Sequence, residues 1–178
     1  KNLVQSAAKF AGNKGICVSP VTIARRFNAN VSFYEIPAEG NIIPPQVDSR
    51  QLSLYGACWT AGSLKYLCES DAESITYYET AGERGIIQGD LASQWPDQFP
   101  SSEGEVFPAY FVFRYLLANK DMNVVKSISS HPGKTECLAL TDGKKVRALL
   151  VNLTGEVQIV RISCCSGLFR IISLHSWN

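Results

Sequence analysis

The spacing of apolar residues changes near residue 121, and this change is what most limits the folds open to the chain. Before that point, segments with helical 3-and-4 spacing alternate with two short runs of strand formers. After it, apolar and polar residues alternate with a period of two. The first pattern indicates parallel strands connected by helices, and the second indicates a small antiparallel sheet. We therefore predict an α/β chain with two domains, residues 1–120 and residues 121–178.

The first domain is predicted to run helix, strand, long loop, helix, strand, long loop, helix. Helices are expected over residues 3–11, 48–68 and 108–118, strands over 16–23 and 74–79, and loops over 24–47 and 82–106. This order matches the last two βα units of a (β/α)8 barrel of the TIM type. Pro20 lies late in the first strand and predicts that the strand ends there or bulges.

The second domain is predicted to be a small antiparallel β-sandwich. The expected strands are residues 124–128, 136–140, 146–153, 157–162 and 168–174. Asp142-Gly143 is a strong hairpin signal between two of these strands.

Composition excludes several functions. The net charge is +1, which gives no reason to expect nucleic acid or an anionic membrane as a partner, and no segment has the roughly 18 apolar residues of a membrane span. The six cysteines form no CxxC pair, so we expect reduced thiols in a cytoplasmic protein. With only His131 and His175 as imidazoles, we expect no metal site, and we expect no cofactor.

The most informative candidate residue is Glu79, which ends the second predicted strand before Gly82 and Gly85 break the regular structure. Barrel enzymes hold their catalytic groups at the carboxyl ends of the strands. Tyr77 is expected on the same side of the strand as Glu79. The alternative is that Glu79 only pairs with an arginine such as Arg84.

Other candidates would contact a substrate from the two long loops. Arg26 and Asn28 open the first loop, and an arginine there can grip a carboxylate or sugar hydroxyls through its fork of donors. Trp95 in the second loop can stack on a sugar face. The predicted substrate-binding set is Tyr77, Arg26, Asn28, Trp95 and Arg84. We expect Glu79 to lie at a concave mouth between these loops.

Several runs of residues, in their order and spacing, resemble the C-terminal part of the D-apionate lactonase family. These runs are Val18-Ser-Pro-Val-Thr, Arg26-Phe-Asn, Pro45-Gln-Val-Asp, Gln51-Leu-Ser-Leu-Tyr-Gly-Ala, Gly62-Ser-Leu-Lys-Tyr-Leu, Thr76-Tyr-Tyr-Glu-Thr, Phe107-Pro-Ala-Tyr-Phe-Val-Phe and Leu150-Val-Asn-Leu-Thr. The resemblance implies a bacterial sugar-acid hydrolase with a catalytic barrel, related to clan-A glycoside hydrolases, followed by a small β-domain. It also implies hydrolysis of a sugar lactone. Where the family usually has tryptophan in a Gly-Trp-Arg-Gly run, this chain has Glu83.

Three functions stay open at this point: a sugar lactonase, a barrel glycoside hydrolase, or a non-catalytic fragment that serves binding or assembly. The chain has no Gly-x-Ser-x-Gly elbow, which disfavours serine-hydrolase chemistry. A glycosidase needs a second carboxylate facing Glu79. Two parallel strands cannot close a barrel. We therefore expect the chain to belong to a longer polypeptide or to associate with other chains.

Overall fold

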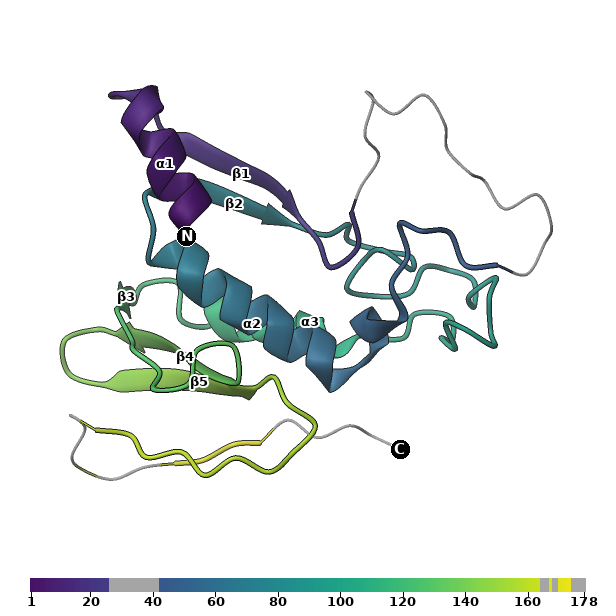
Figure 1. Cartoon of the computed structure of the whole chain (residues 1–178). Coiled ribbons are helices and arrows are strands. Elements are labelled where there is room, and N and C mark those ends of the chain that lie inside the picture. The colour runs from purple at the N-terminus through teal and green to yellow at the C-terminus, as the bar shows by residue number, and fades with distance from the viewer. Residues whose placement is uncertain (26–41, 164–166, 168–169, 174–178) are drawn as a thin grey trace.

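The computed structural model describes residues 1–25, 42–163, 167 and 170–173, and Figure 1 shows how their elements are arranged. In chain order the elements are helix α1 (Asn2–Ala11), strand β1 (Ile16–Val21), the 3-10 helix η1 (Ser49–Leu52), helix α2 (Leu54–Cys68), strand β2 (Ala72–Tyr77), helix α3 (Pro108–Leu117) and strands β3 (Asn123–Val125), β4 (Thr135–Thr141) and β5 (Val146–Asn152). Arg26 and Asn28 lie outside the described residues.

Strands β1 and β2 form a two-stranded parallel sheet, as the alternation of helices and strands predicted. Val18 lies opposite Ile75, and the register is irregular between Val18 and Val21. This irregularity includes Pro20, whose missing N–H cannot take part in regular pairing, and it confirms the predicted bulge. The described residues form two parallel strands of a barrel-type α/β unit and not a closed barrel.

Helix α2 is the central element, with α3 and the second sheet packed against it (Figure 1). The Asp48 carboxylate caps η1 by accepting from the Arg50 N–H at 3.0 Å. Gly56 lets η1 approach α2 closely, since a Cβ there would lie 2.6 Å from the Arg50 carbonyl oxygen. Helix α3 begins at Pro108, the first-turn position that the sequence predicted.

The second sheet is antiparallel with the order β3-β4-β5. The predicted turn between β4 and β5 is present: Gly143 has φ +84°, and the Asp142 carboxylate accepts the Lys144 and Lys145 N–H groups at 2.9 and 2.8 Å.

The prediction of a strand over residues 157–162 is wrong, because this segment has no regular structure. Val157 and Ile159 are 94% and 99% exposed, so within the described part of the chain these side chains pack against no partner strand or facing layer. The predicted strand 168–174 lies partly outside the described residues, and residues 170–173 form no strand. A β-sandwich is therefore not observed; the second part of the described chain contains a three-stranded sheet.

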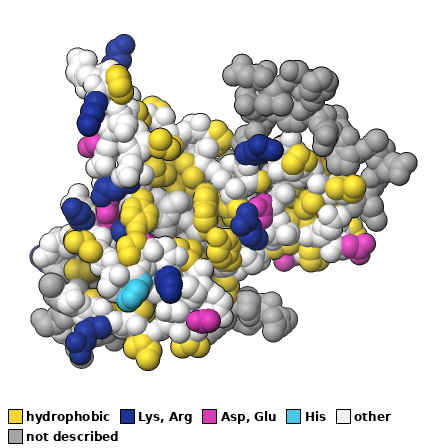
Figure 2. Space-filling view, in the orientation of Figure 1, with side chains coloured by type: hydrophobic (Ala, Val, Ile, Leu, Met, Phe, Trp, Pro, Cys, Tyr) yellow, Lys and Arg dark blue, Asp and Glu magenta, His cyan; other side chains and the backbone are white. Residues whose placement is uncertain are grey.

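One core cluster joins both parts of the chain. It brings together α2, α3, β4 and β5 through Ala57, Ala61, Leu64, Val112, Leu138 and Val151. Other apolar side chains are exposed around the first part, including Leu3 and Phe10 on α1 at 87% and 91%. Figure 2 shows hydrophobic side chains gathered across the middle of one face of the molecule. Among the described residues, no helix has the length and apolar character needed to cross a bilayer.

Candidate active site

The chain leaves the carboxyl end of β2 through a kink at Tyr78. The Tyr78 N–H still donates to the Val21 carbonyl at 3.3 Å, but its φ of +47° is left-handed. The side chain is buried, and its hydroxyl lies 2.7 Å from the Thr60 hydroxyl on α2. Strand β2 thus ends two residues before Glu79, and not at Glu79 as the sequence predicted.

The kink changes the direction of the neighbouring side chains. Regular alternation along a strand would place Tyr77 and Tyr78 on opposite sides, but it does not hold here. Both hydroxyls reach α2, that of Tyr77 lying 2.7 Å from the Ser63 hydroxyl. The Tyr77 ring also contacts Phe113 of α3, with centroids 5.6 Å apart. Tyr77 therefore packs in the layer between the strands and the helices.

Burial strongly affects the titration of these two tyrosines. It raises the pKa of Tyr78 to about 12. Burial also raises the pKa of Tyr77 above its usual value. Both hydroxyls are therefore protonated at neutral pH and serve as hydrogen-bonding groups.

Glu79 lies just beyond the kink, and its carboxylate is accessible. Its N–H donates to the Arg84 carbonyl at 3.1 Å, and its Oε1 lies 3.3 Å from the Arg84 Nε. The two side chains are 44% and 45% exposed. The pairing with Arg84 that the sequence suggested is thus present, at a position that a small molecule can reach.

A compact turn connects Glu79 to Arg84. The Gly85 N–H donates to the Gly82 carbonyl at 2.8 Å, and the Ile86 N–H donates to the Thr80 carbonyl at 3.2 Å. Only glycine fits at position 85, because a Cβ would lie 2.7 Å from the Ala81 backbone. The buried Gln51 side chain donates from its Nε2 to the Gly85 carbonyl and ties the turn to η1.

The second loop is held by buried contacts of its own. The Phe99 and Phe107 rings are buried and meet edge to face with centroids 5.7 Å apart. The Ser101 hydroxyl donates to the buried Gln88 side chain at 2.9 Å. Trp95 is half-buried in this loop, and its carbonyl accepts the Phe99 N–H at 2.7 Å. Packing of this kind gives Trp95 a defined place in the loop.

The two long loops meet where the structure describes both. The Ile43 N–H of the first loop donates to the Gln98 side chain of the second at 3.3 Å. An apolar groove of about 340 Å³ lies elsewhere, on the side of β2 that faces the helices. It is lined by Leu64, Ile75, Tyr77, Ile86, Phe113, Leu116 and Leu117. The expectation that Glu79 lies at a concave mouth stays a prediction.

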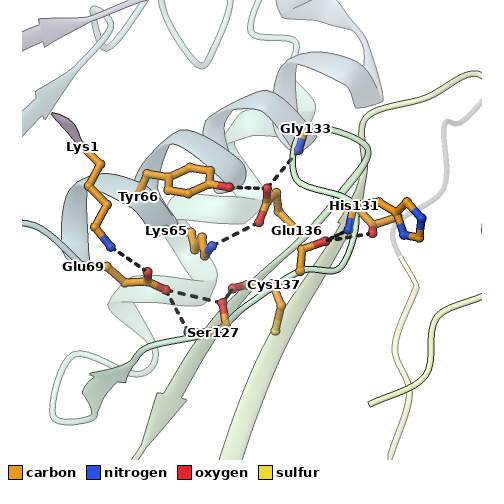
Figure 3. Close-up of polar contacts among 11 residues, drawn as sticks. Lys1, Lys65, Tyr66, Glu69, Ser127, His131, Gly133, Glu136 and Cys137 are labelled. Carbon is orange, nitrogen blue, oxygen red and sulfur yellow. Dashed lines mark hydrogen bonds and ion pairs between the residues drawn. The ribbon is translucent and has the colours of Figure 1, made fainter. Parts of the chain in front are cut away.

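Sequence reasoning missed a buried ion pair between α2 and β4 (Figure 3). Lys65 Nζ lies 3.2 Å from Glu136 Oε2, and the side chains are only 4% and 1% exposed. Tyr66 and the Gly133 N–H both donate to Glu136 Oε1. The sequence did contain a signal for this burial. Side chains two residues apart lie on the same face of a strand, so Glu136 shares a face of β4 with the buried Leu138 and Leu140.

The charge state of Glu136 follows from these contacts. Burial alone would raise its pKa, but hydrogen bonds from Tyr66, Gly133 and Lys65 outweigh burial and hold the pKa below its usual value. The donated bond in turn raises the pKa of Tyr66 to about 12. Nearby, Glu69 accepts the Ser127 N–H at 3.0 Å and lies 3.7 Å from Lys1 Nζ (Figure 3). These contacts attach the second sheet to α2.

The part of the chain that the structure describes contains no group of three His, Cys, Asp or Glu side chains placed to bind a metal.

Comparison with known families gives one match. Residues 1–121 match the family model described as D-apionate lactonase, TIM barrel domain. The match ends just before β3, which begins at Asn123. No curated protein and no solved structure matches the chain.

Proposed function

The chain belongs to the D-apionate lactonase family, and we propose that it supplies part of the active site of a hydrolase that opens a sugar-acid lactone. The observation that carries the proposal is the position of Glu79. Its carboxylate is half-exposed, directly beyond the carboxyl end of a parallel strand, and lies beside a guanidinium. Barrel enzymes hold their chemistry at this end of the sheet.

Opening a lactone requires attack of water on the ester carbonyl and cleavage of the ring C–O bond. In our proposal Glu79 acts as the general base and accepts a proton from the attacking water. Negative charge then develops on the carbonyl oxygen, where N–H donors stabilise it. Collapse of this intermediate breaks the ring C–O bond, and Glu79 returns the proton to the leaving ring oxygen. In our proposal Arg84, whose guanidinium lies beside Glu79, supplies such N–H donors or binds the oxygens of the sugar acid.

The remaining contacts with substrate are assigned to the loops. We propose that Trp95 stacks on the sugar and that Arg26 and Asn28 contribute from the first loop. Tyr77 is left in a supporting role, because its hydroxyl contacts Ser63 on the helix side of the strand.

The substrate class is tested by supplying the protein with a branched sugar-acid lactone and, separately, with aryl glycosides. Hydrolysis of a lactone at neutral pH releases one proton per turnover, whereas cleavage of a glycosidic bond releases a sugar and its aglycone. We expect catalysed proton release with the lactone at a rate well above the buffer control. Cleavage of the glycosides without opening of the lactone would contradict the proposal.

A further inference from the structure

We propose that Tyr78 is a positioning residue for Glu79: its anchored side chain holds the left-handed kink that places the carboxylate beside Arg84 at the surface. The inference rests on the proposed function in one respect, namely that Glu79 performs the chemistry. Tyr78 itself contacts neither water nor substrate in this proposal.

The backbone at Tyr78 is unusual. Among the described residues it is the only non-glycine residue with positive φ, at +47°. The left-handed region is uncommon for bulky side chains, and a residue held there costs free energy unless its surroundings compensate. Such outliers often occur at functional sites.

Three sets of contacts hold Tyr78 in this conformation. The residue is 6% exposed, and its ring meets the Phe113 ring edge to face, with centroids 6.3 Å apart. Its N–H donates to Val21 of β1. Its hydroxyl contacts Thr60, which is fully buried and itself donates to the Gly56 carbonyl at 2.7 Å. Because Thr60 has one hydroxyl proton, Tyr78 is the donor to Thr60.

The kink determines where Glu79 points. In an uninterrupted strand Glu79 would share the side of Tyr77, two residues earlier. That side faces α2 and lines the apolar groove, where a carboxylate would be buried. With the kink, Glu79 is instead 44% exposed and paired with Arg84. By holding the kink, the Tyr78–Thr60 hydrogen bond therefore keeps the Glu79 carboxylate accessible at the surface and prevents it from pointing toward the core.

The test uses two variants that remove this bond, Tyr78→Phe and Thr60→Val. Thr60→Ser keeps the hydroxyl and serves as the conservative rescue. Tyr66→Phe is the matched control, because it removes a tyrosine hydroxyl bond to Glu136 at the α2–β4 contact. In each variant, hydrogen exchange of the Glu79 amide is measured together with kcat and KM for the lactone.

We expect Tyr78→Phe and Thr60→Val to speed hydrogen exchange of the Glu79 amide. We also expect kcat to fall about ten- to a hundredfold, as a small displacement of a catalytic group does, with little change in KM. Thr60→Ser and Tyr66→Phe should leave these properties close to those of the unmodified protein.

Unchanged exchange of the Glu79 amide in both Tyr78→Phe and Thr60→Val would overturn the proposal. Equal effects in Tyr66→Phe would also overturn it, because they would reflect lost stability and not positioning. If the unmodified protein does not open lactones, the proposed function fails, but exchange of the Glu79 amide still decides whether Tyr78 positions Glu79.

Discussion

Two ion pairs, Glu79–Arg84 and Lys65–Glu136, have nearly the same distance between nitrogen and oxygen but very different exposure to solvent. The distances are 3.3 and 3.2 Å, whereas the exposed fractions are near one half in the first pair and at most 4% in the second. An exposed pair contributes little to stability and can exchange its contacts for those of a ligand. A buried pair is costly to break, because the remaining charge loses its partner in a poorly solvated site.

We therefore predict that Lys65→Met lowers the free energy of unfolding by about 3–5 kcal/mol, since Glu136 would stay buried without its cation. Arg84→Gln, the exposed counterpart, should lower it by less than about 1 kcal/mol. Urea unfolding of the two variants measures both changes. Similar losses in the two would contradict the distinction drawn from burial.

At the scale of elements, local patterns predicted most of the regular structure. The helical stripes predicted α1 and α2, Pro108 marked the start of α3, and Asp142-Gly143 predicted the hairpin between β4 and β5. The kink at Tyr78 was not predictable in this way, because it depends on a hydrogen bond to Thr60, 18 residues away. The strand predicted over residues 157–162 is not formed, because alternation of apolar and polar residues does not by itself provide a neighbouring strand with which to pair.

The contact of α2 with β4 should make stability depend on pH at both extremes. Tyr66 has a folded pKa of about 12 against roughly 10 unfolded, so its contribution is fully present below pH 10 and is lost as pH rises toward 12. Glu136 has a lowered folded pKa, so its contribution is present above the unfolded value and is lost as pH falls through the folded one.

The variant Tyr66→Phe distinguishes the loss of stability at alkaline pH that is caused by Tyr66 from the loss caused by the other tyrosines. We expect the variant to lose less stability between about pH 10 and 12 than the unmodified protein does. The measurement is the free energy of unfolding against pH for both proteins. Parallel curves over that interval would show that the Tyr66–Glu136 bond does not contribute.

For the whole molecule, the sequence predicted the order of the helices and strands better than it predicted which of their faces pack together. The βα alternation predicted the parallel pair of β1 and β2, and Gly82 and Gly85 predicted that regular structure ends after Glu79. The burial of Lys65 against Glu136 was not predicted, because it depends on how the second sheet packs on α2. Arg26 and Asn28, predicted for the same site, stay predictions.

The described sheet has unpaired strand edges, and apolar surface lies beside it. Leu3 and Phe10 are exposed on α1, and the apolar groove follows β2. A closed barrel needs eight strands, against the two parallel strands observed. Exposed edges and apolar patches favour association.

We predict that the isolated 178-residue chain associates, with itself or with further βα units, and that its mass by light scattering exceeds 19.5 kDa. Replacing Leu3 and Phe10 together by glutamate should reduce the association. A well-folded monomer with lactonase activity would contradict the need for additional strands.

The central claim is that the Glu79 carboxylate performs the chemistry, and turnover of a sugar-acid lactone by Glu79→Gln tests it most directly. Glutamine keeps the size of the side chain and removes the group that accepts a proton. Glu83→Gln, in the same turn, is the matched control. We predict that Glu79→Gln lowers kcat by about a hundredfold or more, while Glu83→Gln stays close to the unmodified protein. Unchanged turnover in a correctly folded Glu79→Gln protein would contradict the account.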